Sequence, residues 1–147
     1  MTSPEAQAVD RETIANDLRE QWDGKLDAEK IDAATNAITT ATGVYPAHCS
    51  IASLIFYAKV QVVVDGGKTF DGNAGGAFTP GGGVAFGDVY TDDINALYSN
   101  TATFAITATN VYVAVYFWDS NHNFLGHFQG GGISTVTGAG GGTGSWS

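Results

Sequence analysis

Residues 110–147 read NVYVAVYFWDSNHNFLGHFQGGGISTVTGAGGGTGSWS, and this stretch decides the fold. Apolar and polar side chains alternate with a period of two, the alternation breaks at the polar turn DSNHN and resumes, and the chain then gives way to glycine. A period of two is typical of β-strands, and glycines mark positions where strands bend or pack closely. The stretch therefore predicts compact antiparallel β-structure in the last third of the chain.

The strand just before this stretch allows a hairpin register to be predicted. If Thr109 and Asn110 form a two-residue turn, every pair on one face is apolar: Ala108 with Val111, Ile106 with Val113, Phe104 with Val115, and Ala102 with Phe117. A slip of one residue would bury threonines opposite valines, so the pattern specifies this pairing strongly. Asn110 also tolerates the left-handed conformation that such a turn needs.

Further strands are predicted upstream and downstream. Residues 51–64 alternate as one strand, and we expect the apolar even set to face the core: Ala52, Leu54, Phe56, Ala58, Val60, Val62 and Val64. Asp65-Gly66-Gly67 is a turn signal. Short strands are expected within 69–83 and over 84–91, 123–129, 133–137 and 142–146, with a helical turn at 92–98 capped by Asp92.

About eight short strands without crossover helices predict an all-β fold, either an antiparallel barrel or a sandwich. We favour a small closed barrel, because charged residues make up only 14% of the chain and few are available to protect exposed strand edges. The interior of a barrel of about eight strands is just wide enough for side chains to fill it. We therefore expect a solid core rather than a roomy ligand cup.

Residues 1–43 differ from the rest of the chain. They hold nine of the 15 acidic residues and four of the six basic ones. Ile14, Leu18 and Trp22 recur every fourth residue, which is typical of one face of a short helix. We predict a variable, mobile or partly helical N-terminal segment over residues 1–43 and a β-barrel domain over residues 44–147. Alternatively, the N-terminal segment folds on a partner.

Charge and composition exclude several classes of function. The chain has 147 residues and a formal net charge of −9, which argues against nucleic acid because phosphate binding needs clustered Lys and Arg. No stretch reaches the roughly 18 apolar residues of a transmembrane segment. The first residues, MTSPEAQAVDRE, lack the basic and apolar parts of a signal peptide. We expect a monomer.

Four runs of sequence resemble the virulence-associated (Vap) proteins, which are secreted by rhodococci that live inside macrophages. These runs are YFWDS at 116–120, NFLGHFQGGG at 123–132, STVTGAGGGTGSW at 134–146 and GGGVAFGDVYTDD at 81–93. The resemblance covers roughly residues 45 to 147. It implies a small eight-stranded antiparallel barrel with a disposable N-terminal extension, a secreted or cell-surface location, and a role in the macrophage phagosome. It offers no catalytic residues to carry over.

Motifs for catalysis or metal binding are weak. GKT at 67–69 lacks the glycine of a P-loop, because Val62 stands at that position. His48 and Cys49 are adjacent, so on a strand they point to opposite faces and cannot readily pair. The remaining histidines, His122 and His127, lie without further residues at metal-ligand spacing. We therefore expect no catalytic site, no cofactor and no metal.

An outward aromatic group is the best candidate for an interaction surface. The hairpin register places Tyr112, Tyr116 and Trp118 on the outer face, Tyr57 points outward from another strand, and Leu125 and His127 adjoin Trp118 across the next turn. An exposed aromatic patch marks a surface for a protein, sugar or membrane interface. Alternatively, threonines and the N-terminal segment cover these side chains.

The sequence therefore predicts an exported, virulence-associated protein that supports intracellular survival in macrophages and has no catalytic function. It would bind a host protein or membrane component through its barrel surface. Two alternatives stay open. One is a barrel that binds a small apolar ligand such as a lipid. The other is a hydrolase built around Cys49 or the histidines, which requires a reactive thiol.

Overall fold

The computed structural model describes Arg19 and residues 31–32, 35–36, 43–109 and 112–147, with only the backbone described at 133–134. The predicted helical face of Ile14, Leu18 and Trp22 lies outside the described residues. The division of the chain into residues 1–43 and 44–147 stays a prediction.

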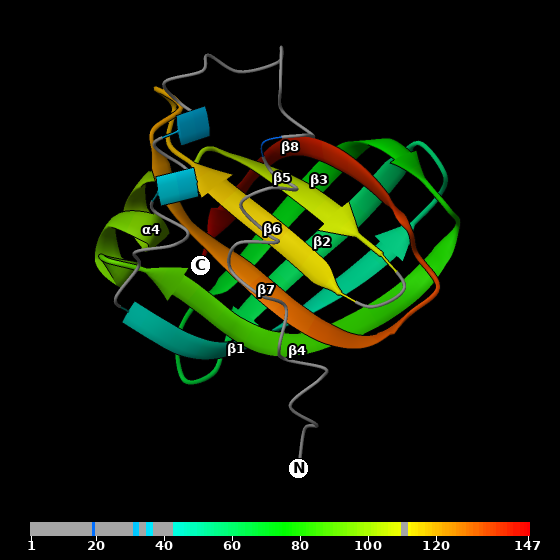
Figure 1. Ribbon diagram of the computed structural model, residues 1–147, viewed down its shortest axis with the longest axis horizontal. Helices are drawn as coiled ribbons and strands as arrows, with labels where there is room; N and C mark the ends of the chain where they lie inside the picture. The colour runs from blue at the N-terminus through cyan, green and yellow to red at the C-terminus, as the bar shows by residue number, and fades with distance from the viewer. Residues whose placement is uncertain (1–18, 20–30, 33–34, 37–42, 110–111) are drawn as a thin grey trace.

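From residue 43 onward, the described part of the chain forms eight strands and one helix. In chain order these are β1 (Gly43–Ser53), β2 (Tyr57–Val64), β3 (Thr69–Phe78), β4 (Gly81–Thr91), α4 (Ile94–Asn100), β5 (Thr103–Ala108), β6 (Val113–Trp118), β7 (Phe124–Ser134) and β8 (Gly138–Trp146). Neighbouring strands are antiparallel, and the sheet closes in the order β1-β2-β3-β8-β5-β6-β7-β4, with β4 returning to β1 (Figure 1). The predicted closed antiparallel barrel with a short helical turn is confirmed.

The connections alternate between the two ends of the barrel, because successive strands run in opposite directions (Figure 1). The hairpin end, at the right of Figure 1, carries the connections at residues 54–56, 79–80, 109–112 and 135–137. The helix end, at the left, carries α4, the C-terminus and the loops at residues 65–68, 92–93, 101–102 and 119–123. Sites at the two ends are therefore separated by the length of the barrel.

Aromatic rings fill the interior. The ring centroid of Phe70 lies 5.1 Å from that of Phe104, 5.0 Å from that of Phe117 and 5.5 Å from that of Trp146. Gly72 makes room for this group, because a Cβ at that position would lie 2.6 Å from the Phe104 ring and 2.7 Å from the Phe70 ring. The interior thus agrees with the expectation of a solid core.

The hairpin of β5 and β6 keeps the predicted faces but not the predicted register. Ile106 pairs with Val115 rather than with Val113, so each partner lies two positions further along β6. The predicted position of the turn is wrong: the N–H of Thr109 donates to the carbonyl oxygen of Tyr112 at 2.9 Å, so Thr109 is paired across the hairpin instead of forming the turn with Asn110. A shift of two residues preserves the parity of a strand, which is why the apolar face still points inward.

A turn that the sequence does not signal interrupts the predicted strand 51–64. Leu54, Ile55 and Phe56 form it, and none of them is a residue type that usually marks turns. Ile55 has a φ of 77°, in the left-handed region that β-branched residues rarely adopt. The turn is therefore formed at a conformational cost that glycine would avoid.

This turn reverses the predicted faces on its N-terminal side. The even-numbered residues from Ala58 to Val64 face the core, as predicted. The even-numbered residues before them, Ala52, Leu54 and Phe56, are exposed instead. Ile51 points inward instead and pairs with Val60 across the hairpin. The error arose because two strands of opposite parity were interpreted as one.

Two further predictions need correction. The helix is capped by Asp93 rather than Asp92, because the Asp93 carboxylate accepts a hydrogen bond from the Ala96 N–H at 3.0 Å. The segments 123–129 and 133–137 were predicted as separate strands, but β7 runs without a break from Phe124 to Ser134, and residues 135–137 connect it to β8. The glycines at 130–132 do not break it, since they pair with β4 in extended conformation.

Replacing Phe70 by alanine is expected to reduce the free energy of unfolding by about 3–5 kcal/mol, because the lost ring leaves a cavity among three aromatic neighbours. Guanidinium denaturation followed by tryptophan fluorescence measures the change. The matched control is Phe86→Ala, on the outer wall with its side chain 52% exposed, for which the loss should stay below about 1 kcal/mol. Equal losses for the two variants would contradict the packing described for Phe70.

Replacing Ile55 by glycine is expected to raise the free energy of unfolding by about 1 kcal/mol, because glycine adopts a positive φ without steric cost. The same denaturation experiment measures this gain. Ile55→Val keeps the branched Cβ and serves as the control that gains nothing. A glycine variant no more stable than the valine variant would mean that the turn is not strained.

Candidate functional site

The predicted interaction surface lies mostly on the outer face of β6 and β7, but that face is buried. Tyr112 is 7% exposed, Trp118 is 4% exposed, and Tyr116 and His127 are fully buried. Of the two alternatives that the sequence left open, these four side chains are covered and not exposed. The sequence could not decide between them, because a period of two identifies the side of a sheet but not what lies over it.

The other two predicted residues differ from these four. Leu125 is half-buried and packs against the core, whereas Tyr57 at the start of β2 is 46% exposed. Tyr57 lies beside the hairpin end, and its hydroxyl donates a hydrogen bond to the side-chain oxygen of Asn73 on β3. The structure therefore does not bring the six predicted residues together as one exposed patch.

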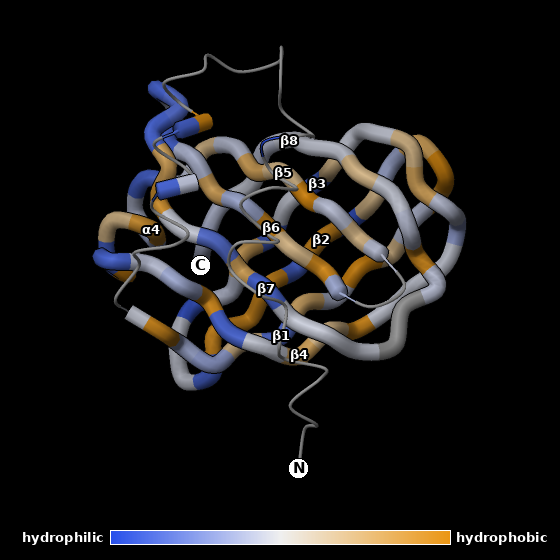
Figure 2. The backbone as a smooth tube through the Cα atoms, in the orientation of Figure 1, coloured by the Kyte–Doolittle hydropathy of each residue, from blue (hydrophilic) through white to orange (hydrophobic). Residues whose placement is uncertain are grey.

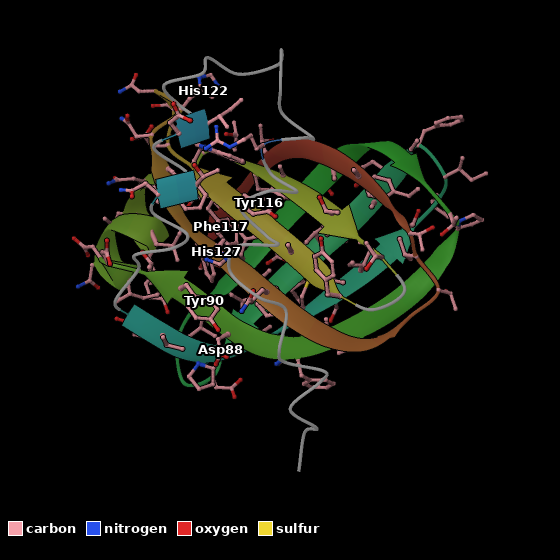
Figure 3. All side chains as sticks on the ribbon, in the orientation of Figure 1. Asp88, Tyr90, Tyr116, Phe117, His122 and His127 are labelled. Carbon is pink, nitrogen blue, oxygen red and sulfur yellow. The ribbon has the colours of Figure 1, made fainter. Side chains whose placement is uncertain are left out.

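Three rings line up across the outer wall instead. Tyr90 of β4, His127 of β7 and Tyr116 of β6 occupy paired positions on adjacent strands (Figure 3). The Tyr90 and His127 rings are stacked at 5.0 Å and 15°, and the Tyr116 and His127 rings are stacked at 6.4 Å and 27°. Tyr90 was not among the predicted residues, although its outward position in the strand 84–91 follows from the same period of two.

A polar group adjoins these rings. Tyr90 hydrogen-bonds the Asp88 carboxylate, and its hydroxyl accepts a hydrogen bond from Gln129 Nε2 at 3.0 Å. Partial burial raises the pKa of the Asp88 carboxyl above its ordinary value, and the hydrogen bond from Tyr90 opposes this effect. Asp88 is therefore a half-buried acid whose charge is only partly compensated.

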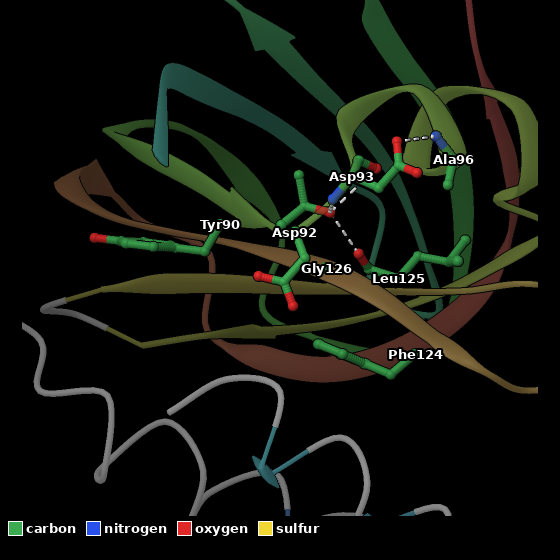
Figure 4. Close-up of a pocket in the computed structure, with 8 residues that line it drawn as sticks. Tyr90, Asp92, Asp93, Ala96, Phe124, Leu125 and Gly126 are labelled. Carbon is green, nitrogen blue, oxygen red and sulfur yellow. Dashed lines mark hydrogen bonds between the residues drawn. The ribbon is translucent and has the colours of Figure 1, made fainter. Parts of the chain in front are cut away.

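A small pocket opens at the helix end, next to Tyr90. It has a volume of about 180 Å³ and is lined by Tyr90, Thr91, Asp92, Asp93, Ala96, Phe124, Leu125 and Gly126 (Figure 4). The lining comes from the end of β4, the first turn of α4 and the start of β7. Sequence analysis could not assemble this set, because its parts are separated by about thirty residues of chain.

Large apolar side chains are exposed at the hairpin end, where the β1–β2 connection is coloured as hydrophobic in Figure 2. Leu54 is 77% exposed, Ile55 48% and Phe56 76%. The backbone beneath them is fixed: Phe78 N–H donates to the Ile55 carbonyl oxygen at 2.7 Å, and Gly76 N–H donates to that of Phe56 at 3.3 Å. We call these three residues the apolar tip.

Charged residues avoid this end. None of the four connections of the hairpin end contains Asp, Glu, Lys or Arg. Among the described residues of the barrel and its loops, the acids lie at the helix end or on strands closer to it: Asp65, Asp71, Asp88, Asp92, Asp93 and Asp119. The barrel is thus polarised, with an acidic helix end and a hairpin end whose connections carry no charge.

Cys49 and the histidines do not form a nucleophilic site in the described structure. Cys49 is fully buried in the core, and burial raises its pKa to about 12, so the reactive thiolate is strongly disfavoured. His48 points to the opposite face, where its Nδ1 lies 3.7 Å from Asp65. His122 is exposed in the loop between β6 and β7.

Across the described part of the chain, no three His, Cys, Asp or Glu side chains are grouped so that they could hold a metal ion. No helix in that part is both long and apolar enough to span a bilayer.

Replacing Asp88 by asparagine is expected to raise the melting temperature at pH 7, because the cost of partly burying a charge disappears. The folded protein holds the Asp88 proton more tightly than the unfolded chain does, so acidification stabilises the folded wild type relative to its state at neutral pH. The advantage of the variant should therefore shrink as the pH falls through the raised pKa toward the ordinary value near 4. Melting curves from pH 7 to pH 4 test this, with Asp71→Asn as the exposed control; a constant difference would contradict it.

Comparisons with known proteins assign the chain to a family. The family model described as Rhodococcus equi virulence-associated protein matches residues 4–147. The structure of virulence-associated protein VapD from Rhodococcus equi is similar, with a TM-score of 0.71 and 34% identity, covering 74% of this chain and 100% of that one.

VapB from the same organism is also similar, with a TM-score of 0.67 and 40% identity, covering 71% of this chain and 96% of that one. A search of curated proteins found no match. The resemblance found in the sequence is confirmed: the chain belongs to the Rhodococcus equi virulence-associated protein family, and its role is virulence-associated.

Proposed function

We propose that this protein is exported and supports bacterial survival inside macrophages, without catalysis, by contacting a host membrane through its hairpin end. The observation that carries the proposal is the apolar tip, where Leu54, Ile55 and Phe56 are exposed side by side. Contiguous exposed apolar residues are rare on soluble proteins and mark interaction surfaces.

The backbone of the apolar tip suits a medium that offers no hydrogen bonds. Besides the bonds to Ile55 and Phe56 described above, the Leu54 N–H donates to the Tyr57 carbonyl oxygen at 2.8 Å, and the Phe56 N–H donates to that of Leu54 at 3.0 Å. Groups already paired within the protein enter an apolar phase without the desolvation cost of unpaired ones. The side chains of Leu54, Ile55 and Phe56 therefore point outward from a backbone that is held by hydrogen bonds.

The surroundings of the apolar tip also favour a membrane over a protein partner. Tyr57 stands at its edge with a half-exposed ring, and Lys59 follows on β2 with an exposed side chain. Tyrosine prefers the interface between water and lipid, and lysine reaches from an apolar surface back into water. With no charge in the loops of this end, insertion buries no ion.

The expected affinity is low. Burial of one large apolar side chain contributes about 1.5–3 kcal/mol, so three contribute roughly 4.5–9 kcal/mol before the cost of association. A single myristoyl chain binds membranes in the same range, marginally and reversibly. The proposed contact is therefore reversible and does not anchor the protein permanently.

The alternative of a carrier for a small apolar ligand receives less support. A carrier needs an internal cavity, whereas the rings around Phe70 occupy the interior at contacts of 5.0–5.5 Å. A host protein as the partner of the apolar tip is an outcome of the test below.

Flotation with phosphatidylcholine vesicles tests the proposal. Wild-type protein should float with the lipid, and the double variant Leu54→Ser/Phe56→Ser should lose most of this binding, because two of the three anchors become polar. Both changed side chains are exposed, so the fold should persist, and circular dichroism checks this.

The matched control is Val84→Ser/Phe86→Ser, which removes two exposed apolar side chains from the outer wall of β4 and should float like wild type. If the tip variant also floats like wild type, the hairpin end is not the membrane site. If wild type does not float, the membrane proposal is wrong, and the tip should then be tested for a host protein by comparing capture with wild type and tip variant.

A further inference from the structure

The pocket at the helix end is independent of the apolar tip and of the function proposed for it. Its opening lies between Tyr90 and Asp92 on one side and Phe124 on the other, above Gly126 (Figure 4). Ligand pockets for drug-sized molecules occupy about 300–1,000 Å³. A pocket of about 180 Å³ suits only a small ligand or one chemical group of a larger one.

Hydrogen bonds hold the two sides of this pocket in place. The Thr91 hydroxyl donates to the Leu125 carbonyl oxygen at 2.7 Å and accepts from the Asp93 N–H at 3.3 Å, which ties the β4–α4 loop to β7. The Asp93 carboxylate in turn accepts from the Ala96 N–H at 3.0 Å. The protein's own side chain thus caps the first turn of α4, and hydrogen bonds within the protein hold the pocket in shape.

A β-bulge shapes the aromatic wall. Phe117 pairs with Gly126 and Trp118 pairs with Phe124, so Leu125 is an extra residue in β7. Bulges re-aim the side chains next to them. Here the bulge turns Phe124 to the outer face, where its ring lies 6.3 Å from that of His127 and 5.7 Å from that of Trp118.

Gly126 forms the floor of the pocket, where it contributes no side chain. A Cβ on Gly126 would lie 2.7 Å from the Tyr90 carbonyl oxygen and 2.9 Å from the Thr91 Cβ. The end of β4 can therefore approach β7 closely only because no side chain stands between them. The same absence leaves space between the Tyr90 and Phe124 side chains.

The charge of the lining selects the ligand. Asp92 and Asp93 contribute carboxylates, and none of the lining residues is Lys, Arg or His. Tyr90 and Phe124 contribute aromatic rings, whose faces attract cations. An anion would be repelled, and a sugar would need more hydrogen-bonding groups than this mainly apolar lining offers.

We propose that this pocket binds a small organic cation of the quaternary ammonium class. The aromatic walls take the apolar methyl groups and attract the positive charge through their π-electrons, and the Asp92 carboxylate faces the charge from the rim. Such a cation belongs either to a soluble compound such as choline or to the head group of a phosphatidylcholine lipid. Both present the same trimethylammonium group to the pocket.

Choline titration followed by two-dimensional NMR of the full chain tests the proposal. The amide signals of Ala96 and Gly126 should shift and saturate, while those of the hairpin end should not. The neutral isostere 3,3-dimethylbutan-1-ol has carbon in place of nitrogen and should bind at least about threefold more weakly, because it lacks the cation–π attraction. Sodium chloride at matched concentration controls for ionic strength.

Two variants test the aromatic wall, at Phe124, and the rim of the pocket, at Asp92, separately. Phe124→Leu should weaken choline binding about threefold to tenfold, which is the range of a cation–π contact. Asp92→Asn should weaken it about twofold to fivefold, less so at high salt. Asp71→Asn, which removes a carboxylate from the wall of β3, should leave it unchanged.

Each result decides the proposal. Localised, saturating shifts that prefer choline over its isostere support it, and the variants then confirm the residues. Equal binding of choline and isostere, diffuse shifts, or no saturation would overturn it. The test does not depend on whether Phe124→Leu folds, because Asp92→Asn alters only an exposed side chain.

The two sources of the cation are distinguished with phosphatidylcholine vesicles added to the Leu54→Ser/Phe56→Ser variant, in which the proposed membrane site is removed. If vesicles shift Ala96 and Gly126 in that background, the pocket takes lipid head groups. If only free choline shifts them, the ligand is a soluble cation. Either result leaves the flotation experiment to be judged separately.

Discussion

A closed barrel of this size is stable only if side chains fill its interior. Here large aromatic rings fill it by packing against glycines. Phe70 contacts three other rings, and these need space on the strands around them. β8 supplies part of it: a Cβ on Gly144 would lie 2.5 Å from the Phe70 ring, and one on Gly140 would lie 2.8 Å from the Phe78 ring. The glycine-rich end of the chain is therefore a complement to the aromatic core.

The filled interior leaves the two ends and the outer wall as the places where this barrel can contact other molecules. The two ends differ because the acidic residues of the described barrel gather toward the helix end, while the loops of the hairpin end hold no charged residue. The protein's own hydrogen bonds hold both ends in shape: backbone hydrogen bonds support the apolar tip, and Thr91 and Asp93 support the pocket. Each end can therefore vary between related barrels without disturbing the core.

Much of this fold could be predicted from the sequence, because period-two alternation reports directly on a sheet with one apolar face. Alternation predicted the antiparallel strands and the inner face of β5 and β6, and the scarcity of charged residues to protect strand edges favoured a closed barrel. The alternation failed at Leu54–Ile55–Phe56, since a turn of apolar residues with Ile55 at positive φ leaves no compositional trace. Alternation placed Tyr116 and His127 on the outer face, but it does not reveal whether that face is covered. The pocket was out of reach, since a bulge and two distant segments create it.

The position of β8 between β3 and β5 has a consequence for how the chain reaches its final state. Until these last nine strand residues are available, β3 and β5 each expose an unpaired edge, and the sheet cannot close. The pairing partners of β8 lie far back in the chain, so closure requires long-range contacts that form slowly. During synthesis from the N-terminus, the barrel can close only after β8 has left the ribosome, and a chain that lacks β8 would remain an open, aggregation-prone sheet.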